Sequence, residues 1–212
     1  MNIQSQSLKK RNLLLTGGSG GLASYIESQL GAEFNVFSPN RHELDVSCLS
    51  SVESYFDGKR FDIVVNLAGT LYSSDIESSN PELWIRDINI NLIGTYLVCR
   101  SALLANCSVE LVNVSSTAAY NNYSDWTSYC ASKAGVMKIS GGLFKGGHQV
   151  VTLCPGAIDT KLRANLTIKN NSVMTVAEGA KPIIDAIQGL YSSGKIVFYR
   201  KGSLEILEDE SK

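Results

Sequence analysis

The sequence predicts an α/β fold of one domain, in which helices cover both faces of a doubly wound parallel sheet as a three-layer αβα arrangement. Short apolar runs bounded by turn residues recur along the chain, and stretches with helical spacing separate them. The first apolar run also breaks into four glycines within five residues, from Gly17 to Gly21. Right-handed crossovers between parallel strands then give the doubly wound topology.

The first expected unit is a strand, a glycine turn and a helix. Leu13 to Leu15 form the apolar run, and Leu22, Ile26 and Leu30 recur at a spacing of four beyond the glycines. Glycine lets the backbone approach a phosphate closely, and a helix N-terminus offers free N–H groups and a partial positive charge. The turn therefore indicates a dinucleotide site, although glycine turns also serve loops that bind nothing.

The later elements are expected in alternation. Pro81 directly after Asn80 marks the start of a long helix, because proline is favoured at the first helical position. Ser47 or Ser50 is expected to cap a short helix that ends near Phe56. The helix that starts near 126 is expected to end early, because glycines crowd its end and each destabilises a helix interior by about 1 kcal/mol relative to alanine. Further strands are expected at 35–38, 63–66, 111–114, 150–154 and 196–199, and further helices at 80–105, 126–144 and 176–191.

Composition and charge are those of an ordinary globular chain. Of 212 residues, 44% are hydrophobic and 18% charged, and the net charge is −1. A net charge so close to zero does not favour binding to nucleic acid or to an anionic membrane. No apolar run is expected to reach the length of a membrane span, and no signal-peptide core precedes the first strand. A cytoplasmic protein is expected, with one domain at 12–204 between a flexible segment at 1–11 and an acidic tail at 205–212.

Cysteines and histidines are few and scattered. The five cysteines contain no CxxC pair, and Cys99 and Cys154 lie in apolar runs, as small buried hydrophobic residues do. This usage suits a reducing compartment. The two histidines, His42 and His148, are far apart and lack ligand spacing, so no metal site is expected.

Small and polar residues gather where the expected strands end, which is where doubly wound sheets bind their ligands. Asn66 to Gly69 follow the third strand, and Pro155 to Thr160 follow the fifth. Small residues at the first of these points would let the backbone pass close to an adenosine or ribose. The polar groups of the second could meet a carboxamide.

A serine, a tyrosine and a lysine follow the fourth strand. Tyr129 lies thirteen residues beyond Ser116, and Lys133 follows one helical turn later on the same helix face. A free tyrosine has a pKa of about 10, which is too high for an efficient general base near neutrality. A neighbouring ammonium favours the phenolate and is expected to lower that pKa.

Taken together, these motifs resemble the short-chain dehydrogenase/reductase family, of the classical type, over roughly residues 12–200. The glycine turn, the Asn-x-Ala-Gly motif, the Ser, Tyr and Lys spacing and the Pro-Gly turn appear in the family's order. Asn91 matches the family's helix asparagine, and Asp45 matches its adenine-contacting aspartate. The resemblance implies a Rossmann fold and an oxidoreductase that moves a hydride between a nicotinamide cofactor and a carbonyl or secondary alcohol.

The resemblance also implies a role for each residue of the site. Tyr129 would exchange the proton with the substrate oxygen, and Lys133 would lower the tyrosine pKa and hold the nicotinamide ribose. Ser116 would hydrogen-bond the carbonyl that becomes an alkoxide, with Ser115 as the adjacent alternative. Asn91 would hold a water in a proton relay, and the hydride would come from the nicotinamide. Cofactor contacts are implied for Gly17, Ser19, Gly20, Gly21, Leu22, Arg41, Asp45, Val46, Asn66, Ala68, Gly69, Tyr129, Lys133, Pro155, Gly156, Ile158 and Thr160.

The residues after the second strand favour NADP over NAD. Dehydrogenases that prefer NAD usually place a carboxylate there to bind the ribose 2′-hydroxyl. This chain has Ser38-Pro39-Asn40-Arg41, with no carboxylate before Glu43, and Arg41 could meet a 2′-phosphate. NAD stays an alternative, as does an Arg41 that only faces solvent.

Some features depart from the family. Ala23 replaces the third glycine of the turn, and Leu67 replaces a second asparagine. The segment from the second strand to Asp45 is short, as in nucleotide-sugar reductases of the extended branch, and so is the lid after Thr160. A small lid implies an open pocket, and its aromatic and polar wall candidates would suit a sugar or would only pack the loop. These candidates are Leu71, Tyr72, Tyr120, Asn122, Tyr123, Trp126 and Leu162.

Three functions therefore stay open. An NADP-dependent oxidoreductase of a small carbonyl or alcohol is favoured, because Asn91, Ser116, Tyr129 and Lys133 are all present. A nucleotide-sugar reductase or epimerase of polysaccharide biosynthesis is the second. A non-catalytic, NADP-binding regulatory module is the third. The family resemblance also implies a homodimer or homotetramer that assembles through the helices at 80–105 and 126–144.

Overall fold

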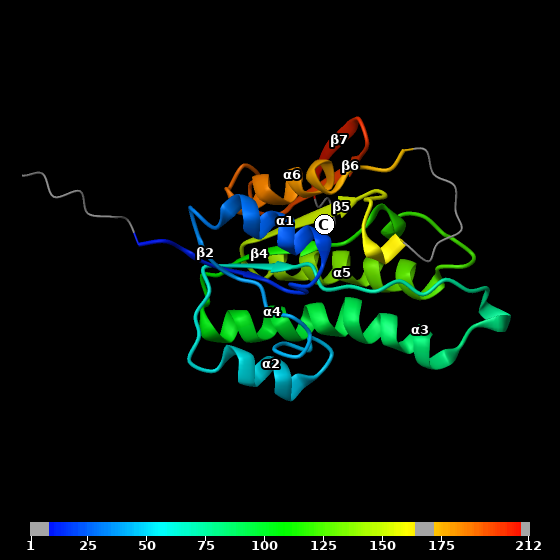
Figure 1. Ribbon diagram of the computed structural model, residues 1–212, viewed down its shortest axis with the longest axis horizontal. Helices are drawn as coiled ribbons and strands as arrows, with labels where there is room; N and C mark the ends of the chain where they lie inside the picture. The colour runs from blue at the N-terminus through cyan, green and yellow to red at the C-terminus, as the bar shows by residue number, and fades with distance from the viewer. Residues whose placement is uncertain (1–8, 164–171, 209–212) are drawn as a thin grey trace, which may run out of the picture.

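The computed structural model describes residues 9–163 and 172–208, and its centre is a seven-stranded sheet (Figure 1). The strand order is β2-β1-β3-β4-β5-β6-β7, and every neighbouring pair is parallel except β6 and β7. The strands are β1 (Asn12–Leu15), β2 (Asn35–Phe37), β3 (Ile63–Asn66), β4 (Glu110–Val114), β5 (Val150–Pro155), β6 (Lys195–Arg200) and β7 (Ser203–Glu208).

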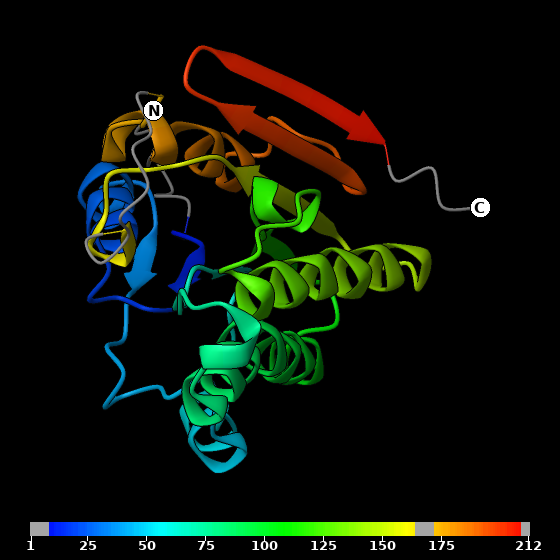
Figure 2. The same ribbon diagram turned by 90° about the vertical axis from the view of Figure 1, so that its right-hand side faces the viewer.

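Helices cover both faces of the sheet, which confirms the predicted three-layer αβα fold (Figures 1 and 2). Two helices, α1 (Gly21–Leu30) and α6 (Val176–Ile187), pack side by side on one face. The other face carries α2 (Leu49–Phe56), α3 (Pro81–Ile88), α4 (Gly94–Ala105) and α5 (Thr127–Lys145).

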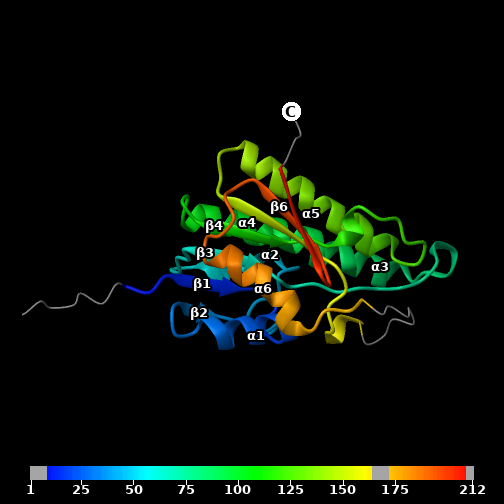
Figure 3. The ribbon, with the colours of Figure 1, turned by 90° about the horizontal axis from the view of Figure 1, so that it is seen from above.

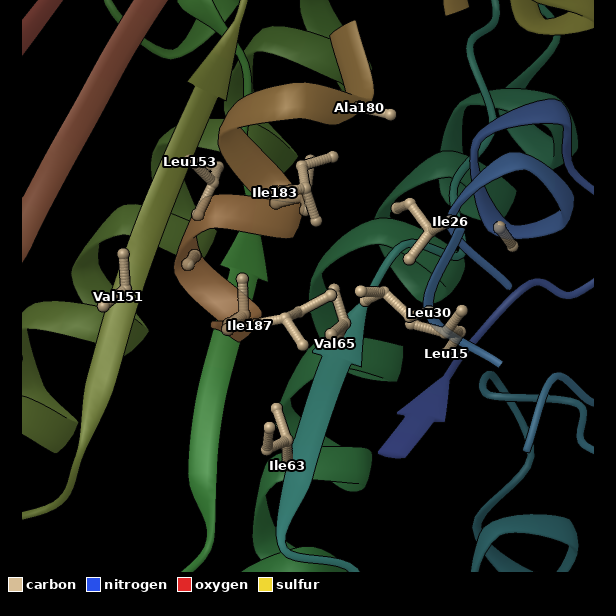
Figure 4. Packing of buried hydrophobic residues seen from close by; sticks show 14 of the residues in the cluster. Leu15, Ile26, Leu30, Ile63, Val65, Val151, Leu153, Ala180, Ile183 and Ile187 are labelled. Carbon is tan, nitrogen blue, oxygen red and sulfur yellow. The ribbon is translucent and has the colours of Figure 1, made fainter. Parts of the chain in front are cut away.

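The first strand shows why the sheet is apolar on both sides. Leu13 and Leu15 belong to the core layer beneath α1 and α6, whereas Leu14 belongs to the layer beneath α2 and α4. All three leucines are fully buried, because helices cover both faces of a parallel sheet. Figure 4 shows the first of these layers, where Ile26 of α1 and Ile183 of α6 face the strands.

The strand order places a crevice at β1. The connection through α1 leads to β2 on one side of β1, and the next connection leads back past β1 to β3 on its other side. Figure 3 shows β2, β1, β3 and β4 following one another in this order. In doubly wound sheets such a reversal opens a ligand crevice at the carboxyl ends of the strands. The glycine turn and the segment after β3 both lie there.

The expected acidic tail at 205–212 is corrected by β7. Ser203–Glu208 pairs antiparallel with β6 along its whole length, so residues 205–208 are part of the sheet. Lys195 also pairs with Glu208 across the two strands. The acidic composition concealed a hairpin strand because its side chains are largely exposed at the sheet edge. Residues 209–212 and residues 1–8 of the expected flexible segment lie outside the described residues.

The expectation that α5 ends early is also wrong. The helix runs through Gly141 and Gly142 to Lys145. Ser140 is buried just before these glycines, where its hydroxyl accepts a hydrogen bond from Asn113 of β4. Leu143 packs against the core just after them. These tertiary contacts offset the low helix propensity of the two glycines.

The long helix starts where proline predicted. Asn80 caps it by accepting hydrogen bonds from the backbone N–H groups of Glu82 and Leu83. Its middle is a π-helical turn, η2 (Asn89–Ile93), which joins α3 to α4. By contrast, α2 begins after Cys48, without a side-chain cap from either predicted serine. The Ser47 hydroxyl instead donates to Asp45.

One helical stretch of the described chain reaches the length and hydropathy of a membrane span, contrary to the expectation that no apolar run would do so. It is Pro81–Ala105, 25 residues long, with a mean hydropathy of 1.4 in its most apolar window. In this fold it is the core helix that packs against β3 and α5. Core helices of globular domains pass the same length and composition test.

Candidate active site

A cleft of about 890 Å³ opens at the carboxyl ends of the strands, and most of the predicted site residues line it. The walls come from the glycine turn, the segments after β3, β4 and β5, and the first turns of α5. The predicted residues in its lining are Gly17, Ser19, Gly20, Gly21, Leu22, Arg41, Asp45, Val46, Ala68, Gly69, Ser116, Tyr129, Lys133, Pro155, Gly156, Ile158 and Thr160. The predicted Asn66 and Asn91 lie beneath it.

The first two glycines of the turn serve the fold. Gly17 has a φ of +73°, and a side-chain carbon there would lie 2.9 Å from the Cα of Ala68. A side-chain carbon on Gly18 would lie only 2.0 Å from the main-chain oxygen of Ser38. Both positions therefore require glycine so that the turn can pack against the ends of β2 and β3.

The last two glycines, Gly20 and Gly21, leave open space at the start of α1. This open space is the glycine cradle. A side-chain carbon on Gly21, the first residue of α1, would meet nothing within 4 Å, and one on Gly20 would meet only the main-chain oxygen of Gly17. No side chain caps α1, and no acidic residue lies in its first turn. The free N–H groups and partial positive charge of this helix end face the cleft, which fits a phosphate group.

Thr16 is a site residue that the sequence reasoning missed. Its buried hydroxyl accepts hydrogen bonds from the backbone N–H groups of Leu67 and Ala68, each at 3.0 Å. These two bonds tie the segment after β3 to the turn after β1. The available signal was a hydroxyl residue directly before the glycines, at the end of a strand otherwise made of leucines.

Tyr129 and Ser116 meet on the wall opposite the cradle. Tyr129 is 8% exposed, and the Ser116 side chain acts on the pKa of its hydroxyl. Burial raises the pKa of Tyr129 to about 12, whereas the bond from Ser116 lowers it and the charge of Asp87 adds to the rise. Ser116 also caps the short helix η3 (Thr117–Ala119). The neighbouring Ser115 donates its hydroxyl to the main-chain oxygen of Lys133, at 2.7 Å.

Lys133 lies 7% exposed on the same helix face as Tyr129. Its Nζ donates to the main-chain oxygen of Val114 at 2.9 Å and lies 5.7 Å from the centre of the Tyr129 ring. Burial lowers the pKa of Lys133 to about 8, although Cys154 and Asp87 raise it in part. The expectation that the ammonium makes Tyr129 acidic is therefore not met in this cleft, because the burial of the phenol dominates.

This geometry agrees with the comparison to known families. The family model described as short chain dehydrogenase matches residues 42–171, which is more than half of the chain. The chain belongs to the short-chain dehydrogenase family. The glycine turn lies before the matched residues, so its assignment depends on the cradle geometry above.

Sequence relatives of this chain include an uncharacterized oxidoreductase of Staphylococcus aureus, strain N315, that is 29% identical over 155 residues. The match covers 70% of this chain and 66% of the relative, so the chain spans just under two thirds of that protein. A second uncharacterized oxidoreductase, from strain USA300, is 33% identical over 59% of this chain and 56% of its own length.

Solved structures share the fold at lower identity. One is a short chain dehydrogenase from Burkholderia cenocepacia in complex with NADP, with a TM-score of 0.76 and 20% identity over 85% of each chain. Another is a small-chain dehydrogenase in complex with NADPH, with a TM-score of 0.81 and 17% identity over 91% of this chain and 98% of that one.

The two predicted asparagines outside the cleft lining are buried, and each has its own hydrogen-bond partners. Asn91, in the π-helical turn η2, accepts from the N–H of Thr70 at 2.8 Å and donates to Thr70 and Ser132. It thereby holds the segment after β3 against α5. Asn66 of β3 donates to Asn113 of β4 at 2.8 Å and to Cys99 of α4 at 3.3 Å. Cys99 and Cys154 are buried, as expected.

Asp87 is a second residue that sequence reasoning missed. It is fully buried on α3, where its Oδ2 accepts from the N–H of Tyr72 at 2.7 Å and from the Ser128 hydroxyl at 3.0 Å. Its carboxylate therefore couples α3 to the residue before Tyr129. A buried charge in an otherwise amphipathic helix was the signal that the sequence offered.

The end of the cleft near Arg41 and Asp45 holds a local charge network. Arg41 is exposed, and its Nε lies 3.3 Å from Oδ2 of Asp45. Asp45 also accepts from the N–H and hydroxyl of Ser47. Glu43 caps the turn by accepting from the N–H of Asn40. A turn replaces the helix between β2 and Asp45, as the sequence predicts.

The wall candidates divide into two groups. Leu71, Tyr123, Trp126 and Leu162 line the cleft. The remaining three, Tyr72, Tyr120 and Asn122, lie outside its lining, and the Tyr120 ring packs edge-on against Phe198. Among the described residues, no group of three His, Cys, Asp or Glu side chains is arranged to hold a metal ion.

Proposed function

We propose that this chain is an NADP-dependent oxidoreductase that moves a hydride between the nicotinamide and a carbonyl or secondary alcohol. One observation carries the proposal: Ser116, Tyr129 and Lys133 share a single cleft with an open glycine cradle at the end of α1. The cradle suits a pyrophosphate, and the three polar side chains suit the oxygen of a reacting carbonyl. The bound nicotinamide would supply the hydride, which no side chain can supply.

Each side chain then has a distinct task. Tyr129 holds its proton at neutral pH, because burial raises its pKa to about 12, and it donates that proton to the oxygen of a carbonyl under reduction. Ser116, which lines the same cleft, donates a second hydrogen bond to this carbonyl oxygen as negative charge develops there. Lys133 places a positive charge behind both groups.

The hydroxyl assignment favours Ser116 over Ser115. Ser115 donates its proton to the main-chain oxygen of Lys133 at 2.7 Å, whereas the bond from Ser116 to the main-chain oxygen of Pro155 is long, at 3.4 Å. A weakly engaged hydroxyl can turn toward a substrate at little cost. Asn91 acts as a positioning residue that holds the Thr70 backbone against α5.

The proposal is tested by two measurements on the full chain. Fluorescence titration measures NADPH binding, and NADPH absorbance follows turnover with aldehydes, aryl ketones, 2-oxo acids and sugar nucleotides. We expect tight NADPH binding and reduction of at least one free carbonyl compound. Turnover of sugar nucleotides alone would favour the nucleotide-sugar reductase or epimerase. NADPH binding without any reduction would favour the regulatory module.

Arg41 supports the choice of NADP. Its guanidinium lies at the adenosine end with most of its surface exposed, where a 2′-phosphate would complete its contacts. Solved structures of the same fold contain NADP or NADPH. We expect Arg41→Gln to weaken NADPH binding about tenfold while NADH binding stays within twofold. Titration of both nucleotides checks this, and an equal loss for both would contradict it.

The glycine cradle yields a paired prediction. Gly21→Ala is expected to weaken NADPH binding at least tenfold while the free energy of unfolding stays the same or rises by up to about 1 kcal/mol, since its new methyl meets only the cradle. Gly18→Ala is expected to lower that free energy by about 1–3 kcal/mol, because its methyl clashes with Ser38. Nucleotide titration and urea unfolding separate the two effects. Normal NADPH binding by the Gly21 variant would contradict the cradle assignment.

A further inference from the structure

The cleft carries far more positive charge than the chain as a whole. Among the described residues, seven lysine and arginine residues line it against the single acid Asp45, in a protein whose net charge is −1. In the proposed function, Arg41 contacts the nucleotide and Lys133 places its charge behind Tyr129 and Ser116. The five that this assignment leaves over are Arg86, Lys161, Arg163, Arg200 and Lys201.

Among these five, Arg86 is the one whose neighbours reach Tyr129. It lies on α3 directly before Asp87, whose Oδ2 accepts from the Ser128 hydroxyl at 3.0 Å, one residue before Tyr129. Trp126 also lines the cleft, and its ring centre lies 6.3 Å from that of Tyr129. Arg86 is therefore tied to the start of the helix that carries the reacting phenol.

Polar atoms without a hydrogen-bond partner occur on two side chains of the cleft lining and on Asp87. Within the described chain, Nε of Arg86, Nε1 of Trp126 and the acceptor Oδ1 of Asp87 are all buried without a hydrogen-bond partner. Native proteins leave few such atoms unpaired, because each loses its bonds to water. The two nitrogens belong to side chains that line the cleft, and the exposed part of the Arg86 guanidinium is open to the acceptor oxygens of a ligand there.

Asp87 pairs with only part of the Arg86 guanidinium. The distance from Nη2 of Arg86 to Oδ1 of Asp87 is 3.6 Å, which is longer than a hydrogen bond. The other carboxylate oxygen already serves Tyr72 and Ser128. The Arg86 side chain is still 40% exposed, so Asp87 steadies its guanidinium without covering it.

We propose that the substrate carries an anionic group, such as a carboxylate, which Arg86 binds with help from the Trp126 indole while Tyr129 acts on the carbonyl. This inference rests on the proposed function and adds the substrate class. A guanidinium pairs with a carboxylate through two parallel hydrogen bonds, which fixes orientation as well as supplying energy. The carbonyl would thereby be held toward the phenol.

The test compares two ketones that differ only in charge, phenylglyoxylate and its neutral methyl ester. We expect the wild-type chain with NADPH to reduce the acid with a kcat/KM at least tenfold above that of the ester. Arg86→Gln should raise KM for the acid by ten- to a hundredfold and leave KM for the ester within threefold of the wild type. Arg86→Lys, which keeps the charge and loses the planar fork, should recover part of the loss.

Arg100→Gln is the matched control. Arg100 is a partly exposed arginine on the next helix, α4, paired with Glu53 outside the cleft. The Arg100→Gln substitution removes the same positive charge from the chain. It should leave kcat/KM for both ketones within twofold of the wild type. Equal use of acid and ester by the wild type, or equal losses for both in Arg86→Gln, would overturn the proposal.

Calorimetry separates this inference from the proposed function. Phenylglyoxylate is titrated into the NADP-loaded wild type and into loaded Arg86→Gln, with no turnover needed. Binding by the wild type that is lost in the variant supports the anion site, even if no carbonyl is ever reduced. Reduction of neutral ketones without any phenylglyoxylate binding would overturn the anion site and leave the proposed function intact.

Discussion

Tyr129→Phe is expected to lower kcat for carbonyl reduction by at least about a thousandfold, because it removes the proton donor of the proposed reaction. NADPH binding should stay within threefold of the wild type. The fold should also be kept, since the phenyl ring retains the buried position of the tyrosine and its edge-on packing with Trp126. Stopped-flow or steady-state NADPH oxidation, together with nucleotide titration, measures both quantities.

Tyr96→Phe is the matched control for this variant. Tyr96 is 48% exposed on α4 and lies outside the cleft lining, so the loss of its hydroxyl should leave kcat within twofold. If Tyr129→Phe keeps more than a tenth of the wild-type kcat, the phenol is not the proton donor and the proposed mechanism fails.

Lys133→Met is expected to abolish turnover and yet to stabilise the fold at pH 7. Burial lowers the pKa of Lys133 to about 8 from an unfolded value of 10.5, so the folded chain carries a disfavoured buried ammonium below pH 8. Removing that ammonium gains up to about 3 kcal/mol. Losing the hydrogen bond to the Val114 carbonyl destabilises the folded chain by roughly 1–2 kcal/mol and offsets part of this gain. We expect a net gain of about 1–2 kcal/mol.

The sign of the pH dependence follows from the same pKa. The folded pKa lies below the unfolded one, so the penalty on the wild type is complete below pH 8 and is relieved as the pH rises from 8 toward 10.5. The stability gap between Lys133→Met and the wild type should therefore be widest near pH 7 and should shrink toward pH 10. Urea unfolding at both pH values measures the gap.

Lys138→Met supplies the comparison on the same helix. Lys138 is exposed, so its replacement should change the free energy of unfolding by less than about 0.5 kcal/mol at either pH. A Lys133→Met variant that is less stable than the wild type at both pH values would show that the lysine stabilises the fold. That outcome would remove the argument that its burial serves a function.

Local patterns in the sequence determined the fold class and the place of the site. Asn80 and Pro81 predicted the helix start, because capping and the fixed φ of proline are local properties. The alternation of strands and helices predicted the parallel sheet, and the spacing of Tyr129 and Lys133 placed both on one helix face. These features depend on residues within a few positions of one another, so a short stretch of sequence is enough to predict them.

Only the tertiary structure decided the features that depend on residues far apart in the chain. The continuation of α5 through Gly141 and Gly142 follows from contacts with β4 and the core. The roles of Thr16 and Asp87 follow from backbone and hydroxyl partners on other elements. The raised pKa of Tyr129 follows from how deeply packing buries the phenol, a quantity that the spacing to a lysine does not contain.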